Sequence, residues 1–498
     1  MKLQKFNTLT SSLSGTAAWR RPTQPFSISS KNGVSLEHLL THRIFMKNLL
    51  GSILGIFLFC VAVFSQGSDA TLRSVIERDR DGRDMSGNIK TLTAAEHLFR
   101  GKTYFENRLF PQSRQHFERI IEQYPMDPAM SGALFMTGRS YYWEREYAKA
   151  IPFLDRVARE YPATKDGREG LSFKGACHIR LGKNAEAAKI YEQYTVMYPA
   201  GERIDGAYLN TIDALREAKK YDEANVWVDK ARSKFPGQPT ETNALQGRLR
   251  MEIYRSKWIE AAATADVMLQ TSTFAGSMTS IDEVKYLKAV ALEKGGKSSE
   301  AAIVYSSIST SPNSYFGGLA SEKYSQGEIK LISQVASKEY PTPFRSEILG
   351  AAKPRKVDPR FVLAIMKQES SFRPGVKSPS AARGLLQLVI DTALKYNKKA
   401  GYASLQADDL YQPQTNISIG CEYIADLSRQ FNGLYEAVAA SYNGGEDNAA
   451  RWLNRSKPRE PGIFASEIGF AETKNYVFKV MNNYRAYRTL YDENLNRK

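Results

Sequence analysis

Aromatic, alanine and proline positions alternate with charged ones in a pattern that repeats every 37 residues through the first half of the chain. An aromatic residue stands before proline at Tyr124-Pro125, Tyr161-Pro162, Tyr198-Pro199 and Phe235-Pro236. A second series with the same spacing opens segments rich in alanine and charge, at Phe110, Tyr147, Asn184, Tyr221 and Trp258. Since proline ends helices and such a period is typical of stacked helix pairs, the pattern predicts a helical solenoid.

The order of these markers resembles tetratricopeptide repeats, which are usually about 34 residues long. Ser299-Glu300-Ala301-Ala302 continues the series after a short insertion near residues 271–280. The resemblance implies a tetratricopeptide-like solenoid over residues 93–325. Such a solenoid can be a spacer, a docking surface for a protein partner or a curved guide for a polymer, and the sequence leaves these open.

A further helix is predicted after Asp358-Pro359, because aspartate is a favoured N-cap and proline a favoured first residue. Val362, Ile365, Met366 and Glu369 then share one face. Loss of water and the nearby helix C-terminus should both raise the pKa of the Glu369 carboxyl. A carboxyl group that stays protonated near neutral pH is what a general acid for glycoside cleavage needs. The alternative is a helix-end glutamate that reaches solvent or caps neighbouring backbone.

Several short segments after this helix resemble soluble lytic transglycosylases in their order and spacing. They are Lys377 to Leu388, Asp391-Thr392-Ala393, Asn416-Ile417 with Gly420 and Tyr423, Ala440 to Gly445, and Phe470 to Val477. The resemblance covers roughly residues 338–485. It implies a lysozyme-like, mostly helical catalytic domain at residues 338–498 and hence an all-α fold. The chain departs from the usual pattern at Leu386, Val389, Ile390, Gly445 and Gly469, which bears on loop rigidity and sugar contacts.

This family cleaves the β-1,4 bond between N-acetylmuramic acid and N-acetylglucosamine in peptidoglycan and leaves 1,6-anhydromuramyl ends. The resemblance makes Glu369 the single catalytic acid/base, which suits cleavage assisted by the substrate's own N-acetyl group. It gives binding or supporting roles to Ser378, Gln387, Tyr442, Asn443 and Glu472. Gln387 and Asn443 have a structural alternative, because each amide could instead hold a loop.

The predicted catalytic domain lacks the residues of other common mechanisms. All histidines precede it, at His38, His42, His97, His116 and His178, and its one cysteine is Cys421. A Ser-His or Cys-His nucleophile and a histidine metal site are therefore excluded within it. No nucleotide-binding motif occurs, and no cofactor or metal is predicted. Cys177 and Cys421 lie in different predicted domains, so no structural disulfide is expected.

The N-terminal segment predicts export. Residues 1–45 are polar and basic, and translation beginning at Met46 explains them more simply than an organellar transit sequence. Residues 46–66 have the basic start, apolar run and small residues of a secretory signal, and residues 49–64 could instead stay as an uncleaved anchor. Residues 67–92 are expected to be a linker. The predicted location is the periplasm or cell envelope.

The formal net charge is +16. About +10 lies after residue 65, since the first 65 residues hold seven Lys or Arg and one acid. This surplus fits attraction to anionic cell-wall polymer, and without a recognised motif it does not indicate nucleic acid. Two other functions stay open: a goose-type muramidase that adds water, and a repeat scaffold of the cell envelope that has lost activity. An intact Glu369 argues against the scaffold.

Overall fold

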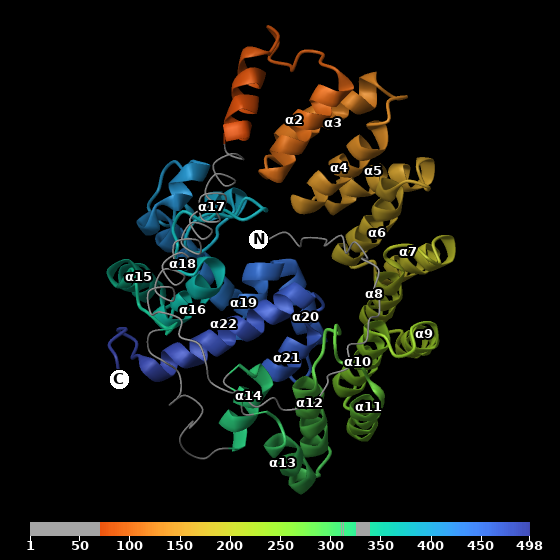
Figure 1. Ribbon diagram of the computed structural model, residues 1–498, viewed down its shortest axis with the longest axis vertical. Coiled ribbons are helices and arrows are strands. Elements are labelled where there is room, and N and C mark those ends of the chain that lie inside the picture. Colours follow the sequence, from red (N-terminus) through yellow and green to blue (C-terminus); the bar gives the residue numbers. More distant parts are fainter. Residues whose placement is uncertain (1–69, 310, 312, 325–338) are drawn as a thin grey trace, which may run out of the picture. The chain divides into compact units, whose positions relative to one another are not determined.

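The computed structural model describes residues 70–309, 311, 313–324 and 339–498 (Figure 1). Regular structure within these residues is helical, and the β-bridges there are isolated. The predicted all-α fold is confirmed. Residues 79–498 form one compact unit, and residues 70–78 belong to another. The predicted extension at 1–45 and the signal or anchor at 46–66 lie outside the described residues.

The repeats form successive pairs of antiparallel helices (Figure 1). Their bounds are α2 Ala94–Glu106, α3 Phe110–Gln123, α4 Met130–Trp143, α5 Tyr147–Glu160, α6 Lys165–Arg180, α7 Asn184–Met197, α8 Ile204–Glu217, α9 Tyr221–Lys234, α10 Pro239–Tyr254, α11 Trp258–Thr271, α12 Ile281–Lys294, α13 Ser298–Ser306 and α14 Tyr315–Tyr324. The second marker series opens the second helix of each pair, from α3 to α11. The aromatic residue before each proline is the C-cap of α3, α5, α7 or α9.

The turn between the two helices of a pair uses one left-handed residue at a fixed place. It is Arg108, Arg145, Lys219 or Ser256 in four repeats, with φ from 57° to 66°. Two other repeats have Gly182 and Gly296 there. A left-handed conformation costs a residue with a side chain roughly 1 kcal/mol and glycine almost nothing. The arginines therefore occupy positions that the backbone alone would give to glycine.

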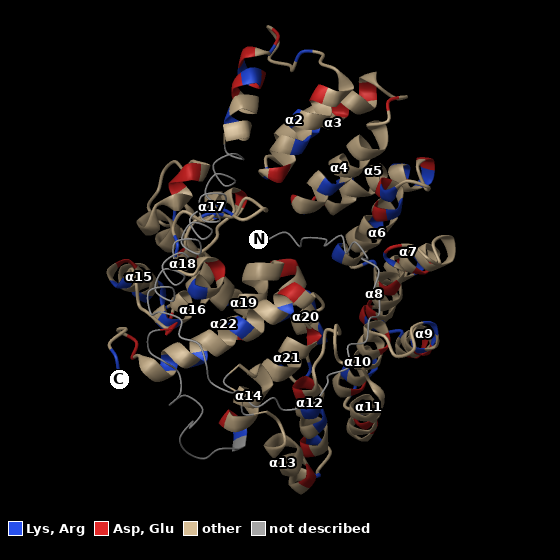
Figure 2. Cartoon of the chain, in the orientation of Figure 1, with Lys and Arg blue, Asp and Glu red and all other residues tan. Residues whose placement is uncertain are grey.

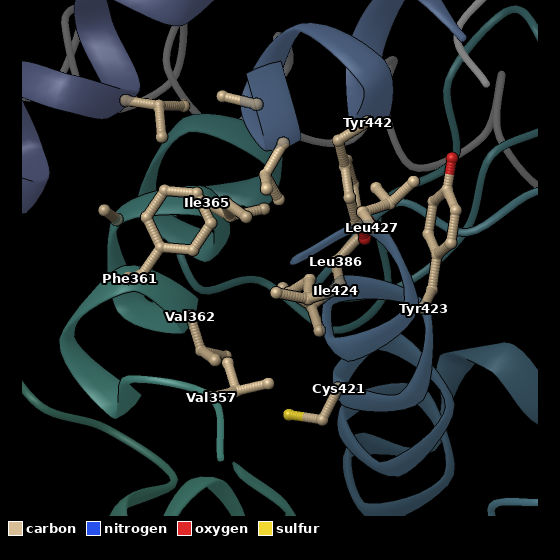
Figure 3. Packing of buried hydrophobic residues seen from close by; sticks show 14 of the residues in the cluster. Val357, Phe361, Val362, Ile365, Leu386, Cys421, Tyr423, Ile424, Leu427 and Tyr442 are labelled. Atoms are coloured by element: carbon tan, nitrogen blue, oxygen red, sulfur yellow. The ribbon is translucent and has the colours of Figure 1, made fainter. Parts of the chain in front are cut away.

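The C-terminal helices pack around a separate apolar core. They are α15 Arg345–Ala352, η3 Lys353–Arg355, α16 Pro359–Ser370, α17 Ile390–Tyr396, η4 Ala407–Tyr411, α18 Pro413–Gln430, α19 Tyr435–Gly444, α20 Glu446–Arg455, α21 Pro461–Glu467 and α22 Ala471–Leu490. Figure 3 shows Val362 and Ile365 of α16 facing Cys421 and Ile424 of α18 across this core, with Leu386 between them. The core thus fixes α16 against α18.

Buried ion pairs join the solenoid to the C-terminal helices. Asp213 and Glu217 of α8 lie 3.4 and 3.1 Å from Nη1 of Arg455 on α20. Nε of the same arginine lies 3.3 Å from Glu467 of α21, and Arg216 of α8 donates to Glu467 at 2.8 Å. The side chains of Arg216, Arg455 and Glu467 are all at least nine-tenths buried. The charged groups of α8 are therefore stabilised by those of α20 and α21 more than by water.

Two expectations from the sequence, one about the linker and one about the cysteines, can be compared with the structure. Residues 70–81, within the expected linker, are helical, and Leu72 and Val75 share a buried face there. Cys177 and Cys421 are both buried free thiols. Burial raises the pKa of each to about 12, which makes them unreactive. None of the helices in the described part of the chain has the length and apolar character to cross a membrane.

A buried hydrogen-bonded chain in the first repeat contains two histidines. The backbone N–H of Leu92 donates to Nε2 of His97 at 3.2 Å, and Nδ1 of His97 lies 3.0 Å from Nδ1 of His116. Nε2 of His116 lies 3.0 Å from Oδ2 of Asp79. One arrangement satisfies every contact: neutral His97 donates from Nδ1 and neutral His116 donates from Nε2. Another proton on His97 would face the Leu92 N–H.

We expect this chain of contacts to make stability fall in mild acid. Burial is the main cause that lowers the pKa of His97, to about 4. Below the ordinary value of 6.5 the unfolded state therefore binds a proton that the folded state refuses, so unfolding becomes easier as pH falls from 6.5 toward 4. The expected loss between pH 7 and 4.5 is on the order of 1–3 kcal/mol. Urea unfolding at both pH values should show it, and His97→Gln should reduce it; an unchanged pH dependence in the variant would rule out His97 as its source.

Candidate active site

Glu369 lies in the last turn of α16 with its side chain turned inward. The helix starts as predicted: Asp358 is its N-cap and accepts from the backbone N–H of Arg360, and Pro359 is its first residue. Val362, Ile365 and Met366 are completely buried and Glu369 is 8% exposed. The predicted shared face is confirmed. The helix stops because Ser371 takes a left-handed C-cap conformation, which leaves Glu369 next to the last helical residue, Ser370.

Two tyrosines from other helices lie near this carboxyl. Tyr442 of α19 and Tyr476 of α22 are buried, at 4% exposure each. Burial first, and then the charge of Glu369, hold the pKa of both hydroxyls well above the ordinary range. Tyr442 donates to the backbone carbonyl of Leu386 at 2.8 Å. Glu369 is therefore set among groups that remain neutral O–H donors.

Tyr476 is a site residue that the sequence analysis did not single out. It falls in the Phe470 to Val477 segment, where the predicted site residue was the acid, Glu472. Thr473, Tyr476, Val477 and Val480 are all buried, which places Tyr476 on the inward face of α22. That spacing of three and four residues was the available signal. Glu472 itself is exposed in the first turn of the helix.

Ser378 and Gln387 lie on one loop, residues 373–389, between α16 and α17. Ser378 Oγ accepts from the backbone N–H groups of Ser380 at 3.3 Å and Ala382 at 3.1 Å. Gln387 is buried, and its Nε2 donates to the carbonyls of Val376 and Gly384, both at 2.9 Å. The amide nitrogen of Gln387 therefore holds the loop together. Sugar contacts by either residue stay a prediction.

Asn443 joins two of the helices around Glu369. Its Oδ1 accepts from Oγ1 of Thr473 at 2.7 Å, which ties α19 to the first turn of α22. Tyr442 precedes it in sequence and Tyr476 follows Thr473 by three residues. The contact therefore fixes the separation of the two helices that carry the tyrosines. A sugar-binding role for Asn443 stays a prediction.

Gly384 is required where the loop meets the domain core. Its φ is 78°, and a Cβ there would lie 2.1 Å from the Leu410 carbonyl oxygen and 2.4 Å from Nδ2 of Asn416. Asn416 is fixed in turn, because its Oδ1 accepts from the Leu386 N–H at 2.7 Å and its Nδ2 donates to the Leu410 carbonyl at 2.8 Å. A side chain at residue 384 would therefore displace buried backbone.

We expect Gly384→Ala to lower the free energy of unfolding by about 2–4 kcal/mol, since it adds left-handed strain to the steric clash. Urea unfolding measures this. Gly375→Ala is the matched control in the same loop, because a Cβ there meets nothing within 4 Å. Its expected effect is below about 0.5 kcal/mol. Equal stability of the two variants would contradict the placement of Gly384.

No group of three His, Cys, Asp or Glu side chains in the described part of the chain is arranged to hold a metal ion. The polar groups gathered at the candidate site are the Glu369 carboxyl, the hydroxyls of Tyr442 and Tyr476, and the loop that carries Ser378 and Gln387.

Two family models match separate parts of the chain. The family "Transglycosylase SLT domain" matches residues 346–463, which include Glu369 and Tyr442. The family "Tetratricopeptide repeat" matches residues 100–163 and 173–239. The chain carries a transglycosylase SLT domain and tetratricopeptide repeats. Both resemblances seen in the sequence are thus confirmed, and the site described above lies on the SLT domain and the helix that follows it.

Curated relatives are similar to part of the chain. The soluble lytic murein transglycosylase of Escherichia coli (strain K12) is 35% identical over 131 residues, which are 26% of this chain and 20% of that protein. The membrane-bound lytic murein transglycosylase C of Serratia proteamaculans (strain 568) is 30% identical over 153 residues, covering 26% of this chain and 43% of that protein. The chain thus spans less than half of the length of either relative.

Among solved structures, an inactive mutant of the lytic transglycosylase Slt from Pseudomonas aeruginosa aligns with 85% of this chain and 86% of its own, at 16% identity and a TM-score of 0.48.

Proposed function

We propose that this protein is an exported lytic transglycosylase that cleaves the β-1,4 bond between N-acetylmuramic acid and N-acetylglucosamine in peptidoglycan and leaves 1,6-anhydromuramyl ends. The observation that carries the proposal is the Glu369 carboxyl, buried at the end of α16 beside Tyr442 and Tyr476 in a matched SLT domain. A buried carboxyl among apolar and neutral groups is suited to general acid catalysis.

Glu369 acts twice in the proposed reaction. It gives its proton to the glycosidic oxygen as the bond to the leaving sugar breaks, while the substrate's N-acetyl group stabilises the cationic centre. The resulting carboxylate then takes the proton of the muramic C6 hydroxyl, whose oxygen closes the anhydro ring. Water is not consumed. Ser378 and Tyr442 orient the acetamido group and the acid, and Gln387, Asn443 and Glu472 support or bind sugar.

The remaining parts of the proposal concern location and partners. The substrate lies outside the cytoplasmic membrane, which requires the export predicted from residues 46–66. Figure 2 shows basic and acidic residues interspersed along the solenoid helices. The net positive charge favours anionic polymer in general. A protein partner of the repeats is a further proposal.

Digestion of purified sacculi with the protein, followed by mass spectrometry of the released muropeptides, tests the function. Anhydromuramyl products are expected. Products heavier by one water, with reducing ends, would make the protein a hydrolase of the goose-lysozyme kind. No products, from sacculi that a known muramidase digests, would favour the scaffold and overturn the proposal.

A further inference from the structure

The first repeat contacts the loop that carries Ser378 and Gln387 and the helix turn just past it. Asn107 and Arg108 form the turn between α2 and α3. Within the loop, beside Ser378, Lys377 Nζ donates to Asn107 Oδ1 at 3.2 Å. Just past its end, in the first turn of α17, Asp391 accepts from Arg108 Nε at 2.9 Å and from Nη2 at 2.6 Å. Figure 1 shows the α2–α3 turn beside the segment that leads into α17.

Arg108 makes these contacts from a backbone position where arginine is unfavourable. Its φ is 65°, and the equivalent turns of two other repeats use glycine. Its side chain is only 2% exposed and stacks over the Phe110 ring at 5.1 Å. A two-point contact between guanidinium and carboxylate is geometrically specific. The pairing with Asp391 therefore gives a reason for an arginine that the turn itself does not need.

The ion pair persists over a wide pH range. Burial acts to raise the pKa of Asp391, but the Arg108 guanidinium outweighs it and holds this pKa at about 2. Lys395 lies in the same neighbourhood, where burial first and then the charge of Arg145 lower its pKa against the opposing charges of Asp391 and Asp447. The contact is thus a fixed structural connection at any pH near neutrality, not a switch.

The loop between these two contacts is connected internally. The backbone N–H of Gly384 donates to the Val376 carbonyl at 3.0 Å, and that of Ser378 donates to the Ala382 carbonyl at 2.8 Å. Asn416 and Tyr442 of the SLT domain hold the loop at Leu386. The first repeat holds Lys377 and, just past the loop, Asp391. A segment held at these three places has little freedom to move as a whole.

We propose that Asn107 and Arg108 of the first tetratricopeptide repeat are positioning residues for the loop of the SLT domain that carries Ser378 and Gln387. They hold this loop in place on the sugar-binding side of the domain. The consequence for activity rests on the proposed function. The repeats would then act in the reaction through their own chain, in addition to any partner they bind.

Arg108→Gly tests this without endangering the fold. Glycine relieves the left-handed strain at residue 108 while it removes the guanidinium. Lys219→Gly is the matched control, because Lys219 occupies the same turn position in another repeat, has a φ of 59° and is exposed. We expect amide hydrogen exchange of residues 376–389 to speed up about tenfold in Arg108→Gly and to stay unchanged in Lys219→Gly.

The same pair of variants is compared on sacculi. In Arg108→Gly the sacculus concentration giving half the maximal rate should rise about fivefold while the maximal rate changes less than about twofold, as expected for lost binding contacts. The double variant Arg108→Asp with Asp391→Arg re-forms an ion pair, and aspartate tolerates a left-handed turn. It should recover part of the slow exchange.

The outcomes separate this proposal from the proposed function. Hydrogen exchange needs no substrate, so it tests the positioning role even if the protein digests nothing. Unchanged exchange of residues 376–389 in Arg108→Gly would overturn the positioning role, whatever the activity. Faster exchange together with inactivity of the unaltered protein would uphold the contact and overturn the reaction.

Discussion

Replacing Glu369 by glutamine is expected to slow release of anhydromuropeptides from sacculi by roughly a thousandfold, the scale of a lost general acid. Glutamine has nearly the same shape and leaves the neutral surroundings of Tyr442 and Tyr476 in place, so the fold should persist. Its amide has no acidic proton to give to the glycosidic oxygen and is too weak a base to take one from the C6 hydroxyl. Both half-steps are therefore lost together. Initial rates by muropeptide chromatography measure the effect.

The matched control is Glu472→Gln, which removes a carboxylate from the first turn of α22. Glu472 is exposed, and its proposed role is in supporting sugar binding. Its loss should cost less than about tenfold, mostly at low substrate. A larger loss of activity from Glu472→Gln than from Glu369→Gln would show that Glu369 is not the catalytic acid. Near-full activity of Glu369→Gln would overturn the mechanism.

The solenoid was predictable because its structure depends on neighbouring segments. Each helix pair buries its apolar face against the next, so the same spacing of aromatic and alanine positions must recur, and the sequence displays it. Glu369 was predictable for a similar reason. Asp358-Pro359 fixes where α16 begins, and counting from it places the carboxyl on the buried face.

Contacts between distant segments were not predictable. Nothing near Arg108 in the sequence indicates Asp391, 283 residues later. Likewise, the amide nitrogen of Gln387 donates to the Gly384 carbonyl within the loop. A motif match cannot distinguish this contact from a contact with sugar. The sequence does not indicate that Arg455 and Asp213 lie in an interface, because a charged residue on a helix is usually exposed to solvent. Only the packing of α8 against α20 and α21 buries Arg455 and half-buries Asp213.

Removal of Arg455 should therefore have the second large effect, on stability. Its guanidinium is shared by Asp213 and Glu217 from the solenoid and by Glu467 from α21. Burial acts to raise the pKa of Asp213, but Arg455 is the strongest of the opposing influences, which hold it below the ordinary range. Arg455→Met would keep most of the volume and leave buried carboxylates short of one cation. The expected loss in free energy of unfolding is about 3–5 kcal/mol.

The control is Arg429→Met. Arg429 pairs with Asp426 along α18 at the surface, where the two side chains are 63% and 41% exposed. Exposed pairs contribute about 0–1 kcal/mol, so this variant should unfold almost like the unaltered protein. Arg451 of α20 also contacts these carboxylates, since its Nη2 lies 2.6 Å from Glu217 Oε1. A loss of less than about 1 kcal/mol in Arg455→Met would show that Arg216 and Arg451 balance the carboxylates on their own.

The pH dependence of the Arg455→Met loss gives a separate check on its cause. Without that guanidinium, the pKa of a buried carboxylate rises, so the carboxylate becomes protonated at a higher pH than in the unaltered protein. The variant then binds a proton on the acidic side that the unaltered protein does not, and the difference in unfolding free energy between the two should shrink as pH falls from 7 to 5. Lost packing of the arginine stem would instead give a difference that does not change with pH. Urea unfolding of both proteins at the two pH values separates the causes, since only an electrostatic interface between α8, α20 and α21 predicts convergence.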